Sequence, residues 1–157
     1  MLIDLVPEFL DILAAPDPVA AYGDYLDRHR AVLASYWHNY VLDLESPHAE
    51  GVIAHALSAD RSDLTDLLAR RDVRRLVDDA LARADELLEA DRPTDCYLMV
   101  GLGGANAGEL VVRGRGAIFL CLEHFTGRAN PTTFGLGLDP ELLPLWAGHE
   151  AAHVVRY

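Results

Sequence analysis

The chain has 157 residues, a mass of 17.2 kDa, 51% hydrophobic residues and 24% charged residues, which fits one globular domain and excludes two large domains or a disordered chain. Its 25 acidic and 13 basic residues give a formal net charge of -12, which would repel a phosphate backbone and argues against nucleic acid as a partner. No apolar run approaches the roughly 18 residues that span a bilayer, and the first residues lack the features of a signal peptide. We therefore expect a cytoplasmic protein with no membrane partner.

The first 92 residues predict a layer of helices. Apolar residues recur at helical spacing from the start of the chain, and Pro16-Asp17-Pro18 separates a short first helix from a long one that begins near Val19. The long helix carries many aromatic side chains, which we interpret as core rather than as a cofactor site. Further helical segments are predicted at about 49–57, after the capping residues 60–63, and over 73–88.

The helical spacing of apolar residues ends at Asp91-Arg92-Pro93. The second region comprises residues 93–157. Short β-branched and aromatic runs bounded by glycine follow and predict three strands, the last two joined as a hairpin across Gly114-Arg115-Gly116. The predicted strands are Cys96–Gly101, Glu109–Arg113 and Ala117–Leu122.

A loop from 123 to 138 leads to a final helix. We expect this helix to begin at Asp139 or Leu143, because a proline directly follows each of them. The predicted fold class is therefore α+β: a helical N-terminal region, residues 1–92, followed by a small, mainly antiparallel sheet and one last helix in residues 93–157.

The last helix contains a motif with metal chemistry. His149-Glu150-Ala151-Ala152-His153 is a complete HExxH. Histidines at i and i+4 share one helix face with about 5–6 Å between their Cβ atoms, so both imidazoles can converge on one ion. The expected ion is Zn2+, which neutral imidazole binds at about 2.0–2.1 Å. Glu150 would then deprotonate the zinc-bound water, as the general base of a metallopeptidase does.

The surroundings of the motif support this interpretation. Apart from the two histidines and the glutamate of the motif, nearly all positions from Leu142 to Val155 are apolar. We therefore expect the helix to be buried on most sides, where two histidines and a carboxylate need strong partners. A metal ion is one such partner. The alternative is a pair of hydrogen-bonded core histidines beside a capped carboxylate.

The order of elements around the motif resembles the front half of the zincin fold, in which an edge strand beside the active-site helix lies antiparallel to a bound peptide. The run from Cys96 through residues 101–106 to Leu122, closed by Gly148–Arg156, is similar to a family of predicted zinc-dependent proteases of the gluzincin type. The resemblance covers about residues 95–157. It implies that His149 and His153 are zinc ligands, that Glu150 is the general base, and that the substrate is a peptide or protein.

The resemblance also implies a third zinc ligand, usually a glutamate from a helix downstream of HExxH, whereas the sequence continues for four residues beyond His153. Three accounts stay open: the chain is the N-terminal part of a longer enzyme, a partner chain completes the site, or an upstream residue supplies the ligand. We expect the first, with this chain inactive on its own.

Other histidines and acids are less promising as ligands. Glu123 and His124 follow the third predicted strand, and we interpret them as strand-end residues that face water. The remaining histidines lack paired ligand spacing and are not assigned to the site; they are His29, His38, His48 and His55.

The glycine-rich segment Gly101-Leu102-Gly103-Gly104, with Gly108, has some of the composition of a phosphate loop. A strand rather than a helix follows it, so no helix N-terminus is available for a phosphate, and we predict a tight strand connection or bulge instead.

Two other function classes stay open beside zinc-dependent peptide hydrolysis. One is a non-catalytic peptide- or protein-binding domain that keeps the edge strand and a vestigial metal site. The other is a helical module that binds a partner through the aromatic face of the long helix. An exposed edge strand also allows a homo-oligomer.

Overall fold

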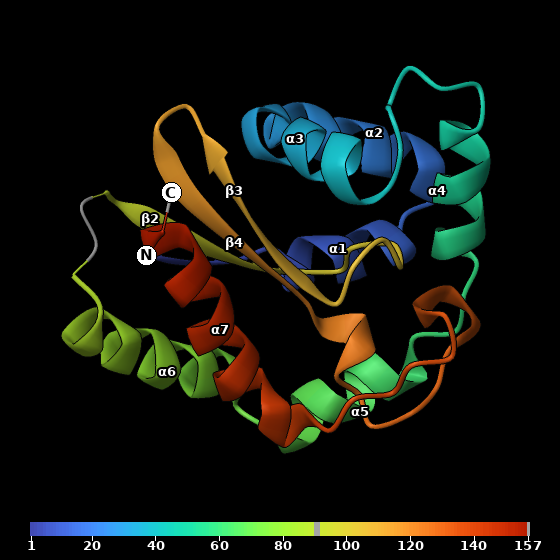
Figure 1. The fold of residues 1–157 in the computed structure, drawn as a ribbon. Helices are drawn as coiled ribbons and strands as arrows, with labels where there is room; N and C mark the ends of the chain where they lie inside the picture. The colour runs from blue at the N-terminus through green and yellow to red at the C-terminus, as the bar shows by residue number, and fades with distance from the viewer. Residues whose placement is uncertain (90–91, 157) are drawn as a thin grey trace.

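The structure is a computed structural model that describes residues 1–89 and 92–156; Asp91, at the predicted boundary, lies outside them. Within this part of the chain the fold is α+β, with seven α-helices around a four-stranded mixed sheet (Figure 1). The helices are α1 (Val6–Leu13), α2 (Pro18–Arg28), α3 (Arg30–Tyr40), α4 (Ala49–Leu57), α5 (Ser62–Arg70), α6 (Val73–Leu87) and α7 (Leu143–Val155). The strands are β1 (Leu2–Asp4), β2 (Thr94–Met99), β3 (Ala107–Val112) and β4 (Arg115–Cys121).

The sheet has the strand order β1-β2-β4-β3. β1 pairs with β2 and β2 with β4 in parallel, and only β3 and β4 are antiparallel. The prediction of a mainly antiparallel sheet is therefore wrong. The first residues form a strand rather than part of a helix, and β4 lies between β2 and β3 in the sheet. A run as short as β1 is too brief for its hydrophobic period to separate strand from helix.

The predicted β3–β4 hairpin is confirmed, with a tighter turn than expected. Val112 pairs with Arg115, so the turn consists of Arg113 and Gly114, both with positive φ (51° and 77°), as in type I′ hairpins. Gly116 lies inside β4, where a Cβ would collide with Val154. Its missing side chain therefore allows α7 to approach the sheet.

The long helix predicted from Val19 is two helices, α2 and α3, which meet at His29. Their aromatic side chains are buried, which confirms that they belong to the core; they are Tyr22, Tyr25, Tyr36 and Trp37. Because these side chains are covered, the aromatic face no longer supports a helical partner-binding module, which remains a prediction. The predicted helices corresponding to α4, α5 and α6 are confirmed.

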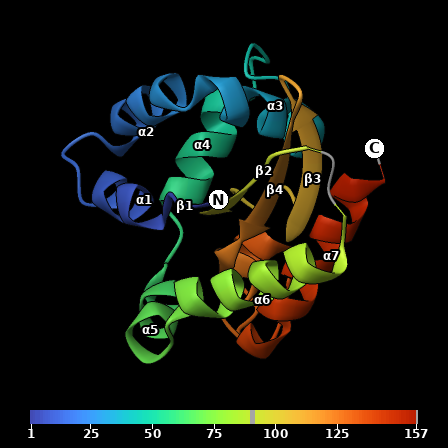
Figure 2. The same ribbon diagram turned by 90° about the vertical axis from the view of Figure 1, so that its left-hand side faces the viewer.

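Helices cover both faces of the sheet (Figures 1 and 2). α7 packs against β3 and β4 beside α6, whereas α3 packs against β3 and α1 contacts β2. One cluster of buried apolar side chains extends from Leu5 to Val154 and includes residues of both the predicted regions. Among the described residues, no helix combines the length and the apolar character needed to cross a membrane.

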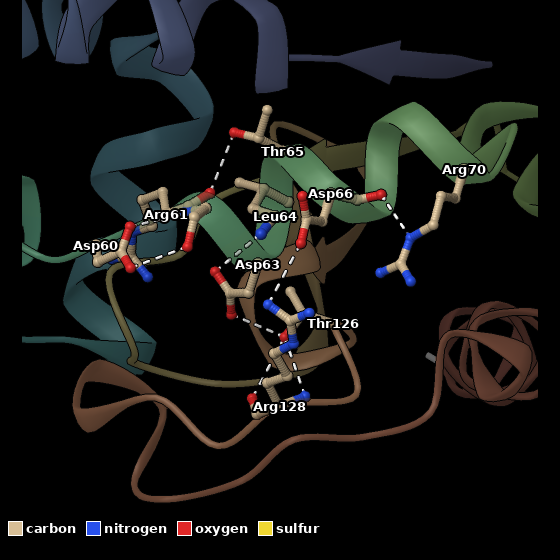
Figure 3. A network of polar contacts seen from close by, with 10 residues as sticks. Asp60, Arg61, Asp63, Leu64, Thr65, Asp66, Arg70, Thr126 and Arg128 are labelled. Atoms are coloured by element: carbon tan, nitrogen blue, oxygen red, sulfur yellow. Dashed lines mark hydrogen bonds and ion pairs between the residues drawn. The ribbon is translucent and has the colours of Figure 1, made fainter.

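The long loop after β4 is attached to α5 by polar contacts (Figure 3). The Thr126 hydroxyl donates to Asp63 Oδ2 at 2.8 Å, and Arg128 forms an ion pair with Asp66 at 3.3 Å. Asn130 donates from its amide to the Asp60 carbonyl at 3.1 Å. These contacts fix the segment that leads from the sheet to α7.

Candidate metal centre

The sequence before α7 provides two successive helix starts. Asp139 accepts a hydrogen bond from the Glu141 amide at 2.9 Å and caps a 3-10 turn, Pro140–Leu142, and α7 then begins at Leu143 with Pro144 in its first turn. Both predicted starting points are therefore used.

α7 is buried along one face rather than on most sides. Its buried residues are Leu143, Ala147, Glu150 and Val154, which recur at helical spacing toward the sheet. His149, in contrast, is exposed and His153 is half-buried. The expectation that the histidines lie in a buried environment is wrong, because the open side of α7 carries them. The alternative of hydrogen-bonded core histidines is wrong as to burial, but the two rings do lie within hydrogen-bonding distance of each other.

His149 and His153 point toward each other. Their Nε2 atoms lie 3.0 Å apart and their ring centroids 4.6 Å apart. Two imidazoles bound to one tetrahedral zinc at about 2.0–2.1 Å would have their nitrogens about 3.3 Å apart, so a small ring rotation would admit the ion between them. Trp146 packs edge-on against His149, with centroids 5.6 Å apart, and restricts that ring on one side. The two imidazole nitrogens can therefore both bind one zinc ion.

Glu150 faces the sheet, where it meets a second carboxyl group. It is 4% exposed, and the carboxyl of Glu109 on β3 lies close enough to affect its ionisation. Burial, followed by the neighbouring carboxyl of Glu109, raises the pKa of Glu150 to about 7. Such a carboxyl both holds and releases a proton near neutral pH.

Glu109 was not singled out from the sequence. It is the one charged residue in the run Ala107–Val112. A single acidic residue in an otherwise apolar strand is the sequence feature that could have indicated a functional role. The Tyr40 hydroxyl of α3 donates to the Glu109 carbonyl at 2.8 Å and so fixes this part of the strand from the opposite layer.

No third ligand joins the histidine pair in residues 1–89 and 92–156, where no group of three or more His, Cys, Asp or Glu side chains could hold a metal. Glu123 and His124 are each 1% exposed, in the 3-10 turn η1 (Leu122–His124) that follows β4. The prediction that they face water is wrong. Of the other histidines, His29 pairs with Glu8 and His38 with Asp43.

The glycine-rich link between β2 and β3 binds a carboxyl group that belongs to the protein itself. Glu123 Oε1 accepts hydrogen bonds from the amides of Gly101 at 2.8 Å and Gly103 at 3.1 Å. Leu102 and Gly103 adopt positive φ values of 55° and 79°, a conformation that turns successive amides toward one point. The link is thus a tight strand connection, as predicted, and its amides are already engaged by Glu123.

Glu123 and His124 should affect stability in opposite directions as the pH changes. Burial raises the pKa of Glu123 to about 7, so its contribution to folding is lost as the pH rises from the unfolded value near 4.5 through 7. Burial and the Arg61 charge lower the pKa of His124 to about 4, so its contribution is lost as the pH falls from about 6.5 toward 4.

Replacing His124 should therefore change the pH dependence of stability. The free energy of unfolding of the wild type should fall as the pH is lowered from 7 to 5. In His124→Leu we expect this fall to be smaller by about 2 kcal/mol. Urea denaturation at both pH values measures this, with His55→Leu at an exposed helical position as the control. An identical pH dependence in His124→Leu and the wild type would show that the buried imidazole does not stay neutral.

Comparison with known proteins adds no relative: no family model matches the chain, and no curated protein or solved structure matches it either. The assignment of a function therefore rests on α7, on the edge strand β3 and on the contacts between them.

Proposed function

We propose that this chain carries zinc-binding and general-base residues of a zincin-like metallopeptidase of the gluzincin type, which hydrolyses a peptide bond. The observation that carries the proposal is the convergence of two Nε2 atoms, 3.0 Å apart, on the open side of α7. Glu150 adjoins the first histidine in sequence and has a pKa raised to about 7.

Each residue has a distinct part in the proposed reaction. His149 and His153 would hold zinc through Nε2, and the metal, when bound, would activate a water molecule and polarise the scissile carbonyl. Glu150 would take up the proton of the attacking water, for which a pKa near the working pH is best suited. The neighbouring carboxyl of Glu109 would help to hold the pKa of Glu150 near 7.

The free edge of β3 supports a peptide substrate. The Cys121 amide donates to the Asn106 carbonyl at 2.9 Å, and this fixes the alternation of the antiparallel pair. The amides and carbonyls of Ala107, Glu109 and Val111 consequently point away from β4. An extended peptide could pair with them as an added strand, although the Tyr40 hydroxyl already donates to the Glu109 carbonyl.

A second candidate function is a non-catalytic peptide-binding domain. It is favoured by one observation: across the described ranges, the histidine pair has no third His, Cys, Asp or Glu beside it, whereas catalytic zinc sites use three protein ligands. In this case the edge of β3 would bind the peptide without cleaving it.

Zinc affinity tests the proposal. We expect His149→Ala and His153→Ala each to weaken zinc binding by about 100-fold or more, because each removes one of the two converging nitrogens. A titration against a chromophoric chelator measures the affinity, and His55→Ala on α4 is a matched control that should bind as the wild type does. Equal affinities in the wild type and both ligand variants would refute the metal site.

A further inference from the structure

We propose that Glu123 is a positioning residue of the candidate site: by binding the amides of Gly101 and Gly103, it fixes the link that places β3, and hence Glu109, beside α7. This inference rests on the proposed function, since it concerns the same site. Glu123 lies outside the HExxH motif and on a different element, η1.

The link has few side chains with which to hold itself in place. The space that a Cβ of Gly103 would fill is taken by the Thr132 carbonyl, and that of Gly104 by the Tyr40 carbonyl at 2.5 Å. The link is therefore enclosed between α3 and the loop that contains Thr132. Its conformation includes left-handed backbone at Leu102 and Gly103, which a non-glycine residue such as Leu102 adopts only at a cost. Hydrogen bonds to its backbone must stabilise this conformation.

Two buried side chains provide these bonds. Glu123 Oε1 holds the Gly101 and Gly103 amides, and the Tyr36 hydroxyl donates to the Gly101 carbonyl at 3.0 Å. Glu123 accepts two hydrogen bonds from the backbone of the link, whereas Tyr36 donates one. We therefore assign the larger share of the restraint to Glu123.

One positive charge inside the protein partly offsets the burial of Glu123. Arg61, which is 5% exposed, lowers the energetic cost of the buried carboxylate. The same guanidinium donates to the Thr132 hydroxyl at 2.9 Å and to the Ala56 carbonyl at 3.1 Å. Arg61 thus joins α4 to η2 (Pro131–Thr133), while its charge acts on Glu123 without a direct ion pair between them. The other titratable side chains that the charge of Glu123 affects are Tyr22, Tyr25, Tyr36 and Cys121.

The link leads directly into β3, so a restrained link also restrains the start of this strand. Three residues separate Gly103 from Ala107, where β3 begins. Among the residues that the structure describes, β3 has a strand partner on one side only, so its position also depends on the link and on the Tyr40 contact with Glu109. A looser link would let β3 move relative to α7, and the contact between Glu109 and Glu150 would weaken.

Amide hydrogen exchange of the metal-free protein tests this proposal separately from catalysis. In Glu123→Ala we expect exchange across residues 107–112 to become at least about 10-fold faster, relative to any change across residues 94–99 of β2. Glu123→Gln keeps an oxygen that can accept both glycine amides, so it should restore most of the protection. Asp63→Ala is the matched control, because it removes another buried carboxylate that contacts the loop through Thr126 but does not contact the glycine link.

The outcomes separate the possibilities. If Glu123→Ala speeds exchange equally in β2 and β3, or if Asp63→Ala has the same selective effect on β3, Glu123 is only a general stabilising residue and the proposal is wrong. If Glu123→Ala does not fold, Glu123→Asp, whose shorter side chain cannot reach both amides, must show the selective effect instead. Zinc affinity, measured on the same variants, should stay within about 3-fold of the wild type. If the wild type does not bind zinc, this result would count against the proposed function and not against this inference.

Discussion

Glu150→Gln is expected to slow peptide hydrolysis by about 10²–10⁴-fold in any zinc-loaded preparation that cleaves a peptide library, while zinc stays bound. Glutamine has nearly the same size as glutamate but cannot accept the proton of the attacking water. The comparison of kcat/KM between the wild type and the variant, together with the zinc content of both, measures the effect.

The control for this experiment is Glu141→Gln, which makes the same chemical change at an exposed position near the start of α7, where Glu141 pairs with Arg71. It should cleave at the wild-type rate. A Glu150→Gln variant with unchanged kcat/KM would remove Glu150 from the reaction, and would leave the non-catalytic peptide-binding domain as the better account.

The largest expected effect on stability is at Gly103. Gly103→Ala places a Cβ against the Thr132 carbonyl and forces alanine to adopt a φ of 79°, so we expect it to lower the unfolding free energy by at least about 2 kcal/mol. Urea denaturation measures this difference. The amides that bind Glu123 would be displaced at the same time.

The same substitution at another glycine should have the opposite sign. Gly23 lies inside α2 with open space around the position of a Cβ, so Gly23→Ala should raise the unfolding free energy by about 0.5–1 kcal/mol through helix propensity. If both variants lose or gain stability alike, the close packing around the glycine link is not what constrains Gly103.

Local patterns predicted those elements whose signals are themselves local. Pro144 and the HExxH spacing identified α7 and the histidine pair, and the glycine at 114 marked the turn of the β3–β4 hairpin. β1 was missed because it has three residues and becomes a strand only through pairing with β2, which is more than 90 positions away in sequence. The parallel pairing of β2 with β4 depends on the same kind of distant contact.

The surroundings of the site could not be predicted for a related reason. Glu123 and the glycine link were both noticed in the sequence, but the hydrogen bonds between them arise when β4 inserts beside β2 and brings η1 under the link. The contact of Glu109 with Glu150 likewise depends on α7 packing against the edge strand. Burial in these contacts raises the pKa of both Glu123 and Glu150 to about 7, and composition carries no information about burial of this kind.

The most direct test of the account is the position of zinc in crystals of the zinc-loaded protein, located by its anomalous scattering. The account predicts one peak on the open side of α7, about 2.0–2.1 Å from Nε2 of both His149 and His153. A zinc peak bound elsewhere, or imidazoles that remain bonded only to each other at saturating zinc, would contradict it.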